Sequence, residues 1–362
     1  MLHTPLDALH RAAGARMVGF AGYDMPLQYP SGIIAEHNHT RQATGLFDAS
    51  HMGQIRVTPR SGTVADAAAA LEALVPGDIP SLAVGRQRYT QFTTADGGIL
   101  DDLMVARLDG ALLLVVNASR KHDDLALLRS RLEPDFAVEL LDRGLLALQG
   151  PKAADCLASL APAVAGMRFM DVGEIVLAYV PCFVSRSGYT GEDGFEIGVP
   201  SAQMETVARL MLADPAVRLA GLAARDSLRL EAGLCLCGAD LDSETSPIEA
   251  GLGWSIRRAG ESFPGADRIR REQAEGPARR RVGLRVEGRI PLRAGAELFS
   301  EAGPAGRVTS GGFAPTINAP VAMAYVAAEQ AAPGTPLFAE IRGNRVAATV
   351  TKLPFVPSHY RR

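Results

Sequence analysis

Short runs of apolar residues, bounded by glycine and proline, set the pattern of this chain. Most of these runs are rich in Val, Ile and Leu or alternate between apolar and polar positions, which is typical of β-strands. The chain contains 37 glycines and 23 prolines, and they divide it into short segments. The pattern predicts strands over residues 53–57, 89–93, 110–117, 175–185, 195–199, 281–286 and 345–353.

Helical periodicity occupies several of the segments between these strands. An Ala- and Leu-rich stretch closed by Pro76 indicates one helix. Another is indicated by Leu125, Leu128 and Leu132, whose spacings of three and four place them on one helical face. Helices are predicted over residues 63–74, 121–132, 151–160 and 202–212.

Strands and helices do not alternate regularly along the chain, and no glycine-rich turn opens a β-α-β unit. This order favours an α+β fold with mainly antiparallel sheets over a doubly wound parallel sheet. The composition shifts over residues 257–293, which hold eleven arginines against five acids, and a strand-rich tail with many glycines and prolines follows. We place a domain boundary near residue 275 and predict a small β domain beyond it.

The overall composition is that of an ordinary globular protein. At roughly 150 residues per domain, 362 residues suggest two to three domains, and 47% are hydrophobic and 21% charged. No apolar run approaches the roughly 20 residues of a membrane span. The N-terminus, with an early Asp7, lacks the pattern of a signal or transit peptide. We therefore expect a cytoplasmic protein without a membrane partner.

Charge and cysteine content exclude further classes. A net charge of −3, from 37 basic and 40 acidic residues, gives no overall basic field for nucleic acid. The four cysteines Cys156, Cys182, Cys235 and Cys237 are too few for a disulfide framework. Cys235 and Cys237 are also too closely spaced for a usual zinc knuckle, and no second pair complements them. We predict buried free thiols and no metal site.

The signatures of several common chemistries are absent. The chain has no HExxH, no phosphate-binding loop, no GxGxxG and no GxSxG motif. His37 and His39, together with His51, could be considered as ligands of a metal ion. His37 and His39, however, would face opposite sides of a strand, and on a helix they would be poorly placed to bind one ion. We predict ordinary structural roles for them. The missing signatures suggest that a bound organic cofactor carries the chemistry.

Two adjacent aspartates follow a Gly-Gly turn at residues 97–103. Neighbouring residues of a strand face opposite sides, so one of Asp101 and Asp102 should face outward and the other should face the protein or a cleft. A carboxylate in a cleft is costly to bury without a charged or donor partner. From spacing alone, a functional carboxylate and a turn aspartate with a salt bridge remain equally good interpretations.

A second glycine-rich turn lies at residues 187–196. Three glycines in seven residues allow the backbone to approach a ligand closely, and Tyr189 offers a stacking face with a polar tip. Glu196 begins the next strand. From this segment alone, a plain β-hairpin loop is a slightly better interpretation than a ligand-binding loop.

The third candidate segment is residues 224–233, where Asp226 is a reasonable helix N-cap. Arg225 would then lie just before the helix, where its rigid donor fork could hold a planar acceptor or a carboxylate. The alternative role for Arg225 is an ion pair with Glu192, Asp193 or Glu231.

Taken together and in order, these segments resemble the aminomethyltransferases of the glycine cleavage system, the T-protein family. The resemblance runs almost from end to end of the chain, and so many motifs in register exclude chance. The motifs are TPL (4–6), FAGYDMP (20–26), GLFDASHMG (45–53), GGILDDL (97–103), VVNA (115–118), LQGPK (148–152), GYTGEDGFE (188–196), ARDSLRLEAG (224–233), TSGGFAPT (309–316) and KLPFVP (352–357).

The resemblance implies a three-domain, clover-like α+β enzyme with tetrahydrofolate in a central opening. Residues 1–52 and 142–275 would form a discontinuous, folate-binding central domain, and residues 53–141 a second α+β domain. Residues 276–362 would form a C-terminal β domain, a small barrel or jelly roll.

The resemblance also implies the reaction. The substrate is an aminomethyl group carried on the lipoyl arm of the H-protein, a transient partner. The carbon passes to the co-substrate tetrahydrofolate, which yields 5,10-methylenetetrahydrofolate, ammonia and the dihydrolipoyl carrier. We expect a monomer or weak dimer.

By position, the functional aspartate of the family falls on Asp102. It would hold the folate nitrogen that receives the carbon and favour the cationic iminium. Glu196 fits as an acceptor for the amino-amide edge of the pterin, and Arg362 is a candidate for the glutamate tail. Phe169 departs from the tyrosine of some members, which removes one hydrogen bond. The expected cofactor contacts are Tyr89, Asn117, Tyr189, Glu196, Arg225, Met52, Met104, Phe169 and Arg362.

Three alternatives stay open. The arginine-rich stretch at 257–293 is either a solvated, salt-bridged surface or a docking face for an acidic carrier protein. A tetrahydrofolate-dependent demethylase on the same fold would share the folate pocket and need no carrier. A non-catalytic folate-binding assembly factor would carry a Lys-Gly-Cys-Tyr-type motif, which this chain lacks.

Overall fold

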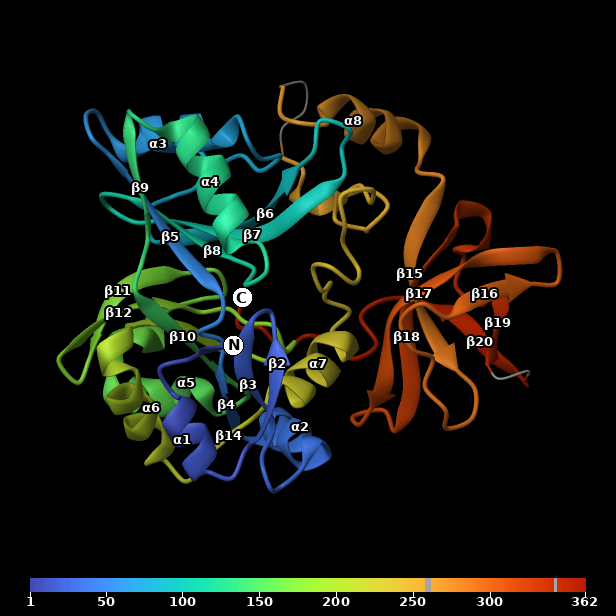
Figure 1. Cartoon of the computed structure of the whole chain (residues 1–362), viewed down its shortest axis with the longest axis horizontal. Helices are drawn as coiled ribbons and strands as arrows, with labels where there is room; N and C mark the ends of the chain where they lie inside the picture. Colours follow the sequence, from blue (N-terminus) through green and yellow to red (C-terminus); the bar gives the residue numbers. More distant parts are fainter. Residues whose placement is uncertain (258–261, 342–343) are drawn as a thin grey trace.

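The structure is a computed structural model that describes residues 1–257, 262–341 and 344–362. Its strands form three open sheets and a closed barrel. Figure 1 shows two lobes of sheet and helix, one above the other, with the barrel to one side and both chain termini near the centre. The fold is therefore mixed α and β with mainly antiparallel sheets and a C-terminal barrel, as the sequence predicts.

The lower lobe of Figure 1 is built on a six-stranded sheet of order β11-β12-β13-β10-β4-β14. Its strands pair antiparallel except for β14, which pairs parallel to β4. The elements are β4 (Thr44–Asp48), β10 (Arg143–Gln149), β11 (Val172–Leu177), β12 (Val180–Ser185), β13 (Gly194–Pro200), β14 (Val217–Leu219), α5 (Ala153–Leu160), α6 (Met204–Leu212) and the 3₁₀ turns η1 (Pro162–Gly166) and η2 (Ser201–Gln203).

The first 42 residues form a three-stranded sheet of order β1-β3-β2 and two helices beside this lobe. A tight turn at Ala21 and Gly22 joins β2 to β3, and both residues adopt positive φ, 47° and 83°. The elements are β1 (Leu2–His3), α1 (Asp7–Ala12), β2 (Arg16–Phe20), β3 (Tyr23–Gln28) and α2 (Ile33–Gln42).

The upper lobe is a five-stranded antiparallel sheet of order β6-β7-β8-β5-β9 with α3 and α4 packed on one face. The Thr63 backbone N–H, just before α3, donates to the Asp66 carboxylate over 2.7 Å and so satisfies one free donor of that helix. The elements are β5 (Gly53–Pro59), α3 (Val64–Glu72), β6 (Arg86–Thr93), β7 (Ile99–Arg107), β8 (Leu112–Val116), α4 (Lys121–Leu132) and β9 (Phe136–Leu140).

The barrel closes in the order β15-β18-β17-β16-β19-β20, and α7, a long loop and α8 connect it to the lower lobe. The elements are α7 (Leu222–Glu231), η3 (Gly253–Ser255), α8 (Ala266–Glu275), β15 (Arg279–Val286), β16 (Glu297–Ser300), β17 (Gly303–Ala314), β18 (Ala319–Ala327), η4 (Ala328–Gln330), β19 (Pro336–Ile341) and β20 (Asn344–Thr351).

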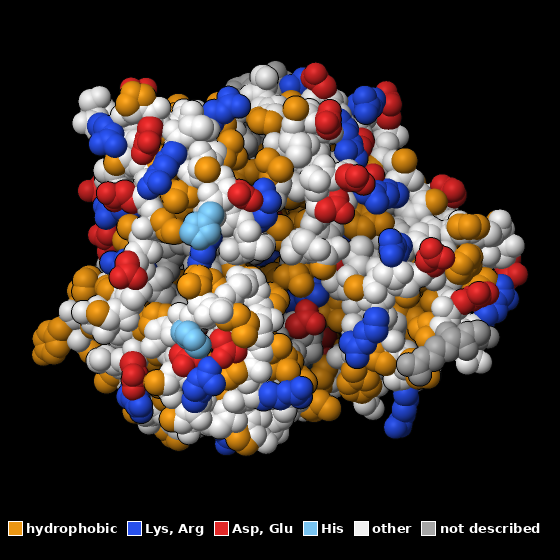
Figure 2. Space-filling view, viewed as in Figure 1, with side chains coloured by type: hydrophobic (Ala, Val, Ile, Leu, Met, Phe, Trp, Pro, Cys, Tyr) orange, Lys and Arg blue, Asp and Glu red, His pale blue; other side chains and the backbone are white. Residues whose placement is uncertain are grey.

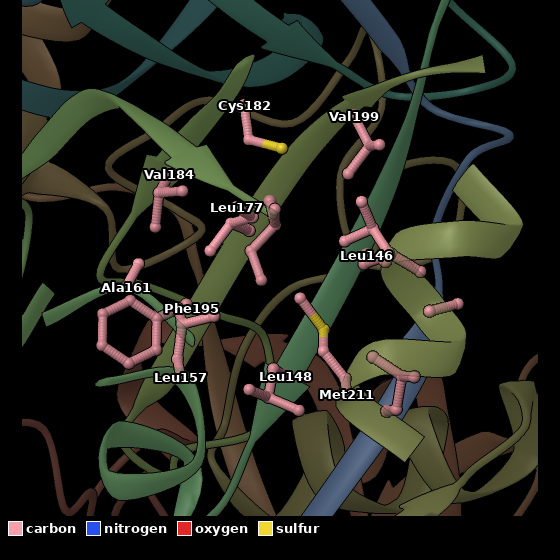
Figure 3. Close-up of a cluster of buried hydrophobic side chains, with 14 of the residues drawn as sticks. Leu146, Leu148, Leu157, Ala161, Leu177, Cys182, Val184, Phe195, Val199 and Met211 are labelled. Carbon is pink, nitrogen blue, oxygen red and sulfur yellow. The ribbon is translucent and has the colours of Figure 1, made fainter. Parts of the chain in front are cut away.

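Each sheet buries one apolar face. In the lower lobe, Leu146 and Leu148 of β10 alternate inward beside Phe195 and Val199 of β13, and Met211 of α6 covers them (Figure 3). All five side chains are buried. Truncating one such core leucine to alanine costs about 2–5 kcal/mol. This packing fixes the strands from which the candidate site residues project.

The predicted helices are confirmed as α3, α4, α5 and α6. The single strand predicted over residues 175–185 is wrong, because the chain reverses there and forms the β11–β12 hairpin. Ala178 and Tyr179 make the turn with φ of 47° and 70°, a conformation that usually carries Gly, Asn or Asp. The usual turn signal is therefore missing from the sequence. Within the described part of the chain, no helix is long and apolar enough to cross a membrane.

Candidate active site

Asp102 lies on the β6–β7 hairpin with two fixed partners. The pairs Tyr89–Met104 and Gln91–Asp102 lie directly across these strands, so their four side chains share one face of the sheet. The Tyr89 hydroxyl donates to Asp102 Oδ2 over 2.9 Å, and the Asn117 amide donates to Oδ1 over 2.8 Å. Burial and the neighbouring Asp101 raise the pKa of Asp102 to about 6. Asp102 is partly exposed. Its two hydrogen-bond partners hold the carboxylate in one orientation, and its pKa lies close to neutral pH.

Asp101 does not face solvent, which corrects the expectation that one aspartate of the pair points outward. It is fully buried, because α4 covers the second face of this sheet. Its carboxylate accepts hydrogen bonds from the Asn117 backbone N–H at 3.0 Å and from the Asn117 side-chain amide at 2.9 Å. One asparagine therefore links both aspartates.

Tyr189 and Arg225 form a second group of contacts. The Arg225 guanidinium lies 4.7 Å from the centre of the Tyr189 ring, and the Tyr189 hydroxyl donates to the Cys235 carbonyl. Arg225 Nη1 is buried, and no hydrogen-bond partner faces it in the described chain. Glu196 acts on Arg225 electrostatically, and Ser187 donates to the Glu196 carboxylate over 3.0 Å. These residues thus bring together a hydrogen-bond donor without a partner, Arg225 Nη1, an acceptor, the Glu196 carboxylate, and the aromatic ring of Tyr189.

Arg225 lies within α7 rather than before it, and Asp226 is not the N-cap. The helix begins at Leu222 after Gly221, and Asp226 instead accepts from Arg229 Nε over 2.8 Å. Both predictions fail because the chain enters the helix at glycine, a weaker N-terminal signal than aspartate.

The three acids weighed as partners of Arg225 have other partners. Arg41 pairs with Glu192 at 2.9 Å and with Glu231 at 2.8 Å, and Arg186 pairs with Asp193. This leaves the Arg225 guanidinium available at the site.

The glycines of the 187–196 loop pack against the protein itself. A Cβ on Gly188 would lie 1.9 Å from Gln149 Oε1, and one on Gly194 would lie 2.3 Å from the Leu148 carbonyl. The absence of side chains therefore lets this hairpin lie directly on β10. The close approach expected for a ligand at these two positions is made by Gln149 and Leu148.

The C-terminal tail crosses the same region. Tyr360 stacks on Phe169 with ring centroids 4.2 Å apart and planes 12° apart, and the Phe169 N–H donates to the Arg361 carbonyl over 2.7 Å. The His359 N–H donates to the Gly191 carbonyl over 2.8 Å. Burial raises the pKa of Tyr360, and Glu196 is among the charges that act on it. Arg362 follows as an exposed terminal residue.

Sequence reasoning missed three further residues near the site. Trp254 stacks on Tyr89 at 5.4 Å and is 58% exposed, and nothing in its local sequence indicates this. Tyr360 lies two residues before the predicted contact Arg362, and the local sequence does not indicate that it stacks on Phe169. His51 was assigned a structural role, but its Nδ1 is buried without a partner in the described structure, and burial and Arg225 lower its pKa to about 4. Met52 and Met104 are both partly exposed, and Met104 lies across from Tyr89.

Two sets of side chains among the described residues have donor atoms close enough to hold one metal ion. One is His3, Asp7 and Asp24 near the N-terminus, and the other is Asp101, Asp102 and Cys237. In the second set Asn117 donates to both carboxylates, so their oxygens already have partners. Cys235 is buried and Cys237 half-buried, and both are free thiols.

Arginines of the 257–293 stretch make many contacts within the protein. Arg268 pairs with Glu249 and Glu272 at 3.1 and 2.7 Å, and Arg279 pairs with Glu249 at 3.0 Å. Around α8, basic and acidic side chains are interleaved on the visible face (Figure 2). These contacts favour the salt-bridged interpretation of the stretch. Residues 258–261 lie outside the described residues.

Comparisons with known proteins agree over the whole chain. Residues 6–259 match the GCVT N-terminal domain, and residues 279–357 match the glycine cleavage T-protein C-terminal barrel domain. "Aminomethyltransferase, mitochondrial" of Gallus gallus is 45% identical over 99% of this chain and 93% of the relative. "Aminomethyltransferase" of Synechococcus sp. (strain RCC307) is 42% identical over 100% and 99%.

A solved structure supports the same assignment. The glycine cleavage system aminomethyltransferase T of Bartonella henselae superposes with a TM-score of 0.93 at 43% identity and covers 99% of both chains. The chain therefore belongs to the T-protein family, the aminomethyltransferases of the glycine cleavage system.

Proposed function

We propose that this enzyme moves the carbon of an aminomethyl group from the lipoyl arm of an H-protein to tetrahydrofolate at Asp102. The observation that carries the proposal is a partly exposed carboxylate, fixed by Tyr89 and Asn117, in the same region as the unpartnered Arg225 donor. Two folate N–H groups and the S–CH₂–NH₂ unit become an N–CH₂–N bridge, a thiol and ammonia. The C–S and C–N bonds of the donor break, and two C–N bonds to folate form.

The side chains around Arg225 fit a reduced pterin. A pterin offers an amide carbonyl and a ring nitrogen as acceptors, together with N–H donors along one edge. Arg225 Nη1 is a buried donor that lacks a partner in the described chain, and Glu196 is an acceptor next to it. Each group left unpaired with a wrong ligand costs about 1–3 kcal/mol, and this cost would supply selectivity.

The role of Asp102 follows from its charge and its fixed orientation. At a pKa of about 6, most molecules carry the carboxylate at neutral pH. A negative charge near the iminium lowers its energy, and the hydrogen bonds from Tyr89 and Asn117 keep the carboxylate from rotating. A positioned group of this kind typically contributes about 10²- to 10⁴-fold in rate.

Further contacts complete the proposed folate site. Tyr189, whose ring lies beside the Arg225 guanidinium, would contact the pterin ring, while Met52 and Met104 would line the pocket. The ordered tail supports Arg362 as the partner of the glutamate moiety, because His359 and Arg361 tie the tail to the protein. The transient partner would be the lipoylated H-protein, and the protein itself a monomer or weak dimer.

The experiment combines the purified chain with tetrahydrofolate and aminomethylated H-protein and measures methylenetetrahydrofolate and ammonia. We expect both products in equal amounts, and none when the carrier is replaced by its unloaded form. Product formation from a methylated small molecule without any carrier would instead identify a demethylase. Absence of both reactions, with the protein folded and binding tetrahydrofolate, would reject the proposed transfer.

A further inference from the structure

A carboxyl group without a donor lies beneath the candidate site. Asp124 projects from α4 and is 1% exposed. Its Oδ2 is fully enclosed, and no hydrogen-bond donor of the described chain reaches it. Burying an ionised carboxylate oxygen without a donor is strongly unfavourable, so Asp124 requires either a partner or a proton.

The group that faces Asp124 is another carboxyl. Asp101 of β7 lies within hydrogen-bond reach of it and is 0% exposed. Two carboxylates in contact cannot both ionise away from water, so the pair keeps one proton. Asp101 already accepts from the Asn117 backbone at 3.0 Å and from its amide at 2.9 Å, whereas Asp124 Oδ2 accepts from nothing described. Donors stabilise the ionised form, which assigns the charge to Asp101 and the proton to Asp124.

The charged surroundings agree with this assignment. Arg120, a cation that acts on Asp124, is paired with the exposed Asp123 at 3.0 Å. The Cys237 sulfur lies within 4.8 Å of carboxylate oxygens of Asp101 and Asp102, and Asp102 adds negative charge on the other face of β7. Burial, the contact with Asp101 and the charge of Asp123 raise the pKa of Asp124 to about 9, with Arg120 opposing.

We infer that Asp124 is a carboxylic acid that donates its proton to the Asp101 carboxylate, and that this pair holds Asn117 and through it orients Asp102. Asp101 and Asp124 are then positioning residues that do not touch the substrate. The proton limits the charge below Asp102 to a single negative charge, since an ionised Asp124 would add a second. The effect on turnover rests on the proposed function, but the protonation of Asp124 does not.

Protonation is measured on the folded protein without any substrate. Aspartate side-chain carboxyl carbons are labelled with carbon-13, and their chemical shifts are followed from acid to alkaline pH by NMR. We expect one carboxyl resonance that is still protonated at neutral pH, absent in Asp124→Asn and present in Asp123→Asn. Asp123 is the matched control, because it is the preceding residue of α4 but 65% exposed. If every aspartate is ionised at neutral pH, the inference is wrong.

The positioning role is tested by the pH dependence of kcat. Asparagine at 124 is neutral and keeps an N–H donor for Asp101, so Asp124→Asn should leave the acidic limb of the profile where the wild type has it. Asp124→Ala removes the donor that holds the Asp101 carboxylate, so Asn117 is held less firmly and donates less well to Asp102. The pKa of Asp102 then rises, because the Asn117 hydrogen bond lowers it, and the acidic limb moves up by about one pH unit.

The outcomes are distinguishable from failure of the proposed function. A downward shift in Asp124→Asn would mean that Asp124 carried a charge, which overturns the inference. An unshifted limb in a folded Asp124→Ala would overturn the positioning role. If the wild type lacks transferase activity, the proposed function fails, and the NMR titration still decides the protonation of Asp124.

Discussion

Glu231 is the buried charge that joins α2, α7, the barrel and the C-terminal tail. Its carboxylate contacts His37 Nε2 at 3.2 Å and Arg41 at 2.8 Å, and it accepts from the Thr316 backbone at 2.8 Å and hydroxyl at 2.6 Å. Its own carbonyl accepts from the tail at Phe355 and Val356. Replacing it with glutamine keeps the volume and removes the charge, so Glu231→Gln isolates the electrostatic contribution.

The size of the effect follows from the pKa of Glu231. Hydrogen bonds from His37, Thr316 and Arg41 outweigh burial and lower this pKa from 4.5 to about 2. The side chain is fully buried, and a lowering of this size corresponds to about 3 kcal/mol of folding free energy. Because the folded-state pKa is depressed, this stability is present above pH 4.5 and disappears as the pH falls toward 2.

Urea unfolding of the two proteins at several pH values measures this contribution. At neutral pH, Glu231→Gln should lose about 3 kcal/mol, and the gap should narrow below pH 4.5 as the wild-type carboxylate is protonated. The control Glu205→Gln removes a 46% exposed partner of Arg209 and should change stability by less than about 1 kcal/mol. A gap that stays constant across the acidic range would refute the electrostatic explanation.

The remaining predictions concern the site. Asp102→Asn should fold normally and lower turnover about 10²- to 10⁴-fold in the coupled transfer assay. Tyr89→Phe removes a hydrogen bond that lowers the pKa of Asp102, so the acidic limb of its kcat profile should move above about pH 6. Arg225→Leu should raise the KM for tetrahydrofolate about tenfold or more with a smaller change in that for the carrier, since one charge-assisted hydrogen bond provides about 1.5–3 kcal/mol. Gly188→Ala should lower the melting temperature, because its Cβ would overlap Gln149.

The sequence predicts the elements and motifs that depend on neighbouring residues. Apolar periodicity located α4, and the order of motifs placed Asp102, Glu196 and Arg225 among candidate residues. Local patterns fail where the decisive contact is distant in the chain. Trp254 against Tyr89 is one such case, because only the folded structure brings them together.

The paired aspartates illustrate the same limit in a different way. Strand alternation correctly separates Asp101 from Asp102, but it cannot tell whether the second face meets solvent or a helix. Once α4 covers that face, Asp101 becomes a buried group that needs donors, and Asn117 and Asp124 provide its surroundings. The turn of the β11–β12 hairpin is not predicted, because the positive φ of Ala178 and Tyr179 is imposed by the pairing of the two strands. No glycine in the sequence indicates a turn there.

The barrel contributes to the site through buried charges. Thr309 and Ser310 of β17 donate to Asp240, which also pairs with Arg229 of α7 at 2.7 Å. Together with Glu231, this network holds the tail against Phe169 and the loop containing Cys235 against Tyr189.

Two acidic transitions should therefore be separate. Protonation of Asp102 near pH 6 would remove turnover reversibly while Glu231 is still ionised, because Glu231 takes up its proton only between pH 4.5 and about 2. Burial and the neighbouring Asp101 place the pKa of the proposed catalytic carboxylate, Asp102, at about 6, whereas hydrogen bonds from His37, Thr316 and Arg41 keep Glu231 ionised. Two side-chain carboxyl groups therefore titrate in different pH ranges. Asp102 at the site changes its charge close to neutral pH, whereas Glu231, between α7, the barrel and the tail, keeps its charge until the pH falls below 4.5.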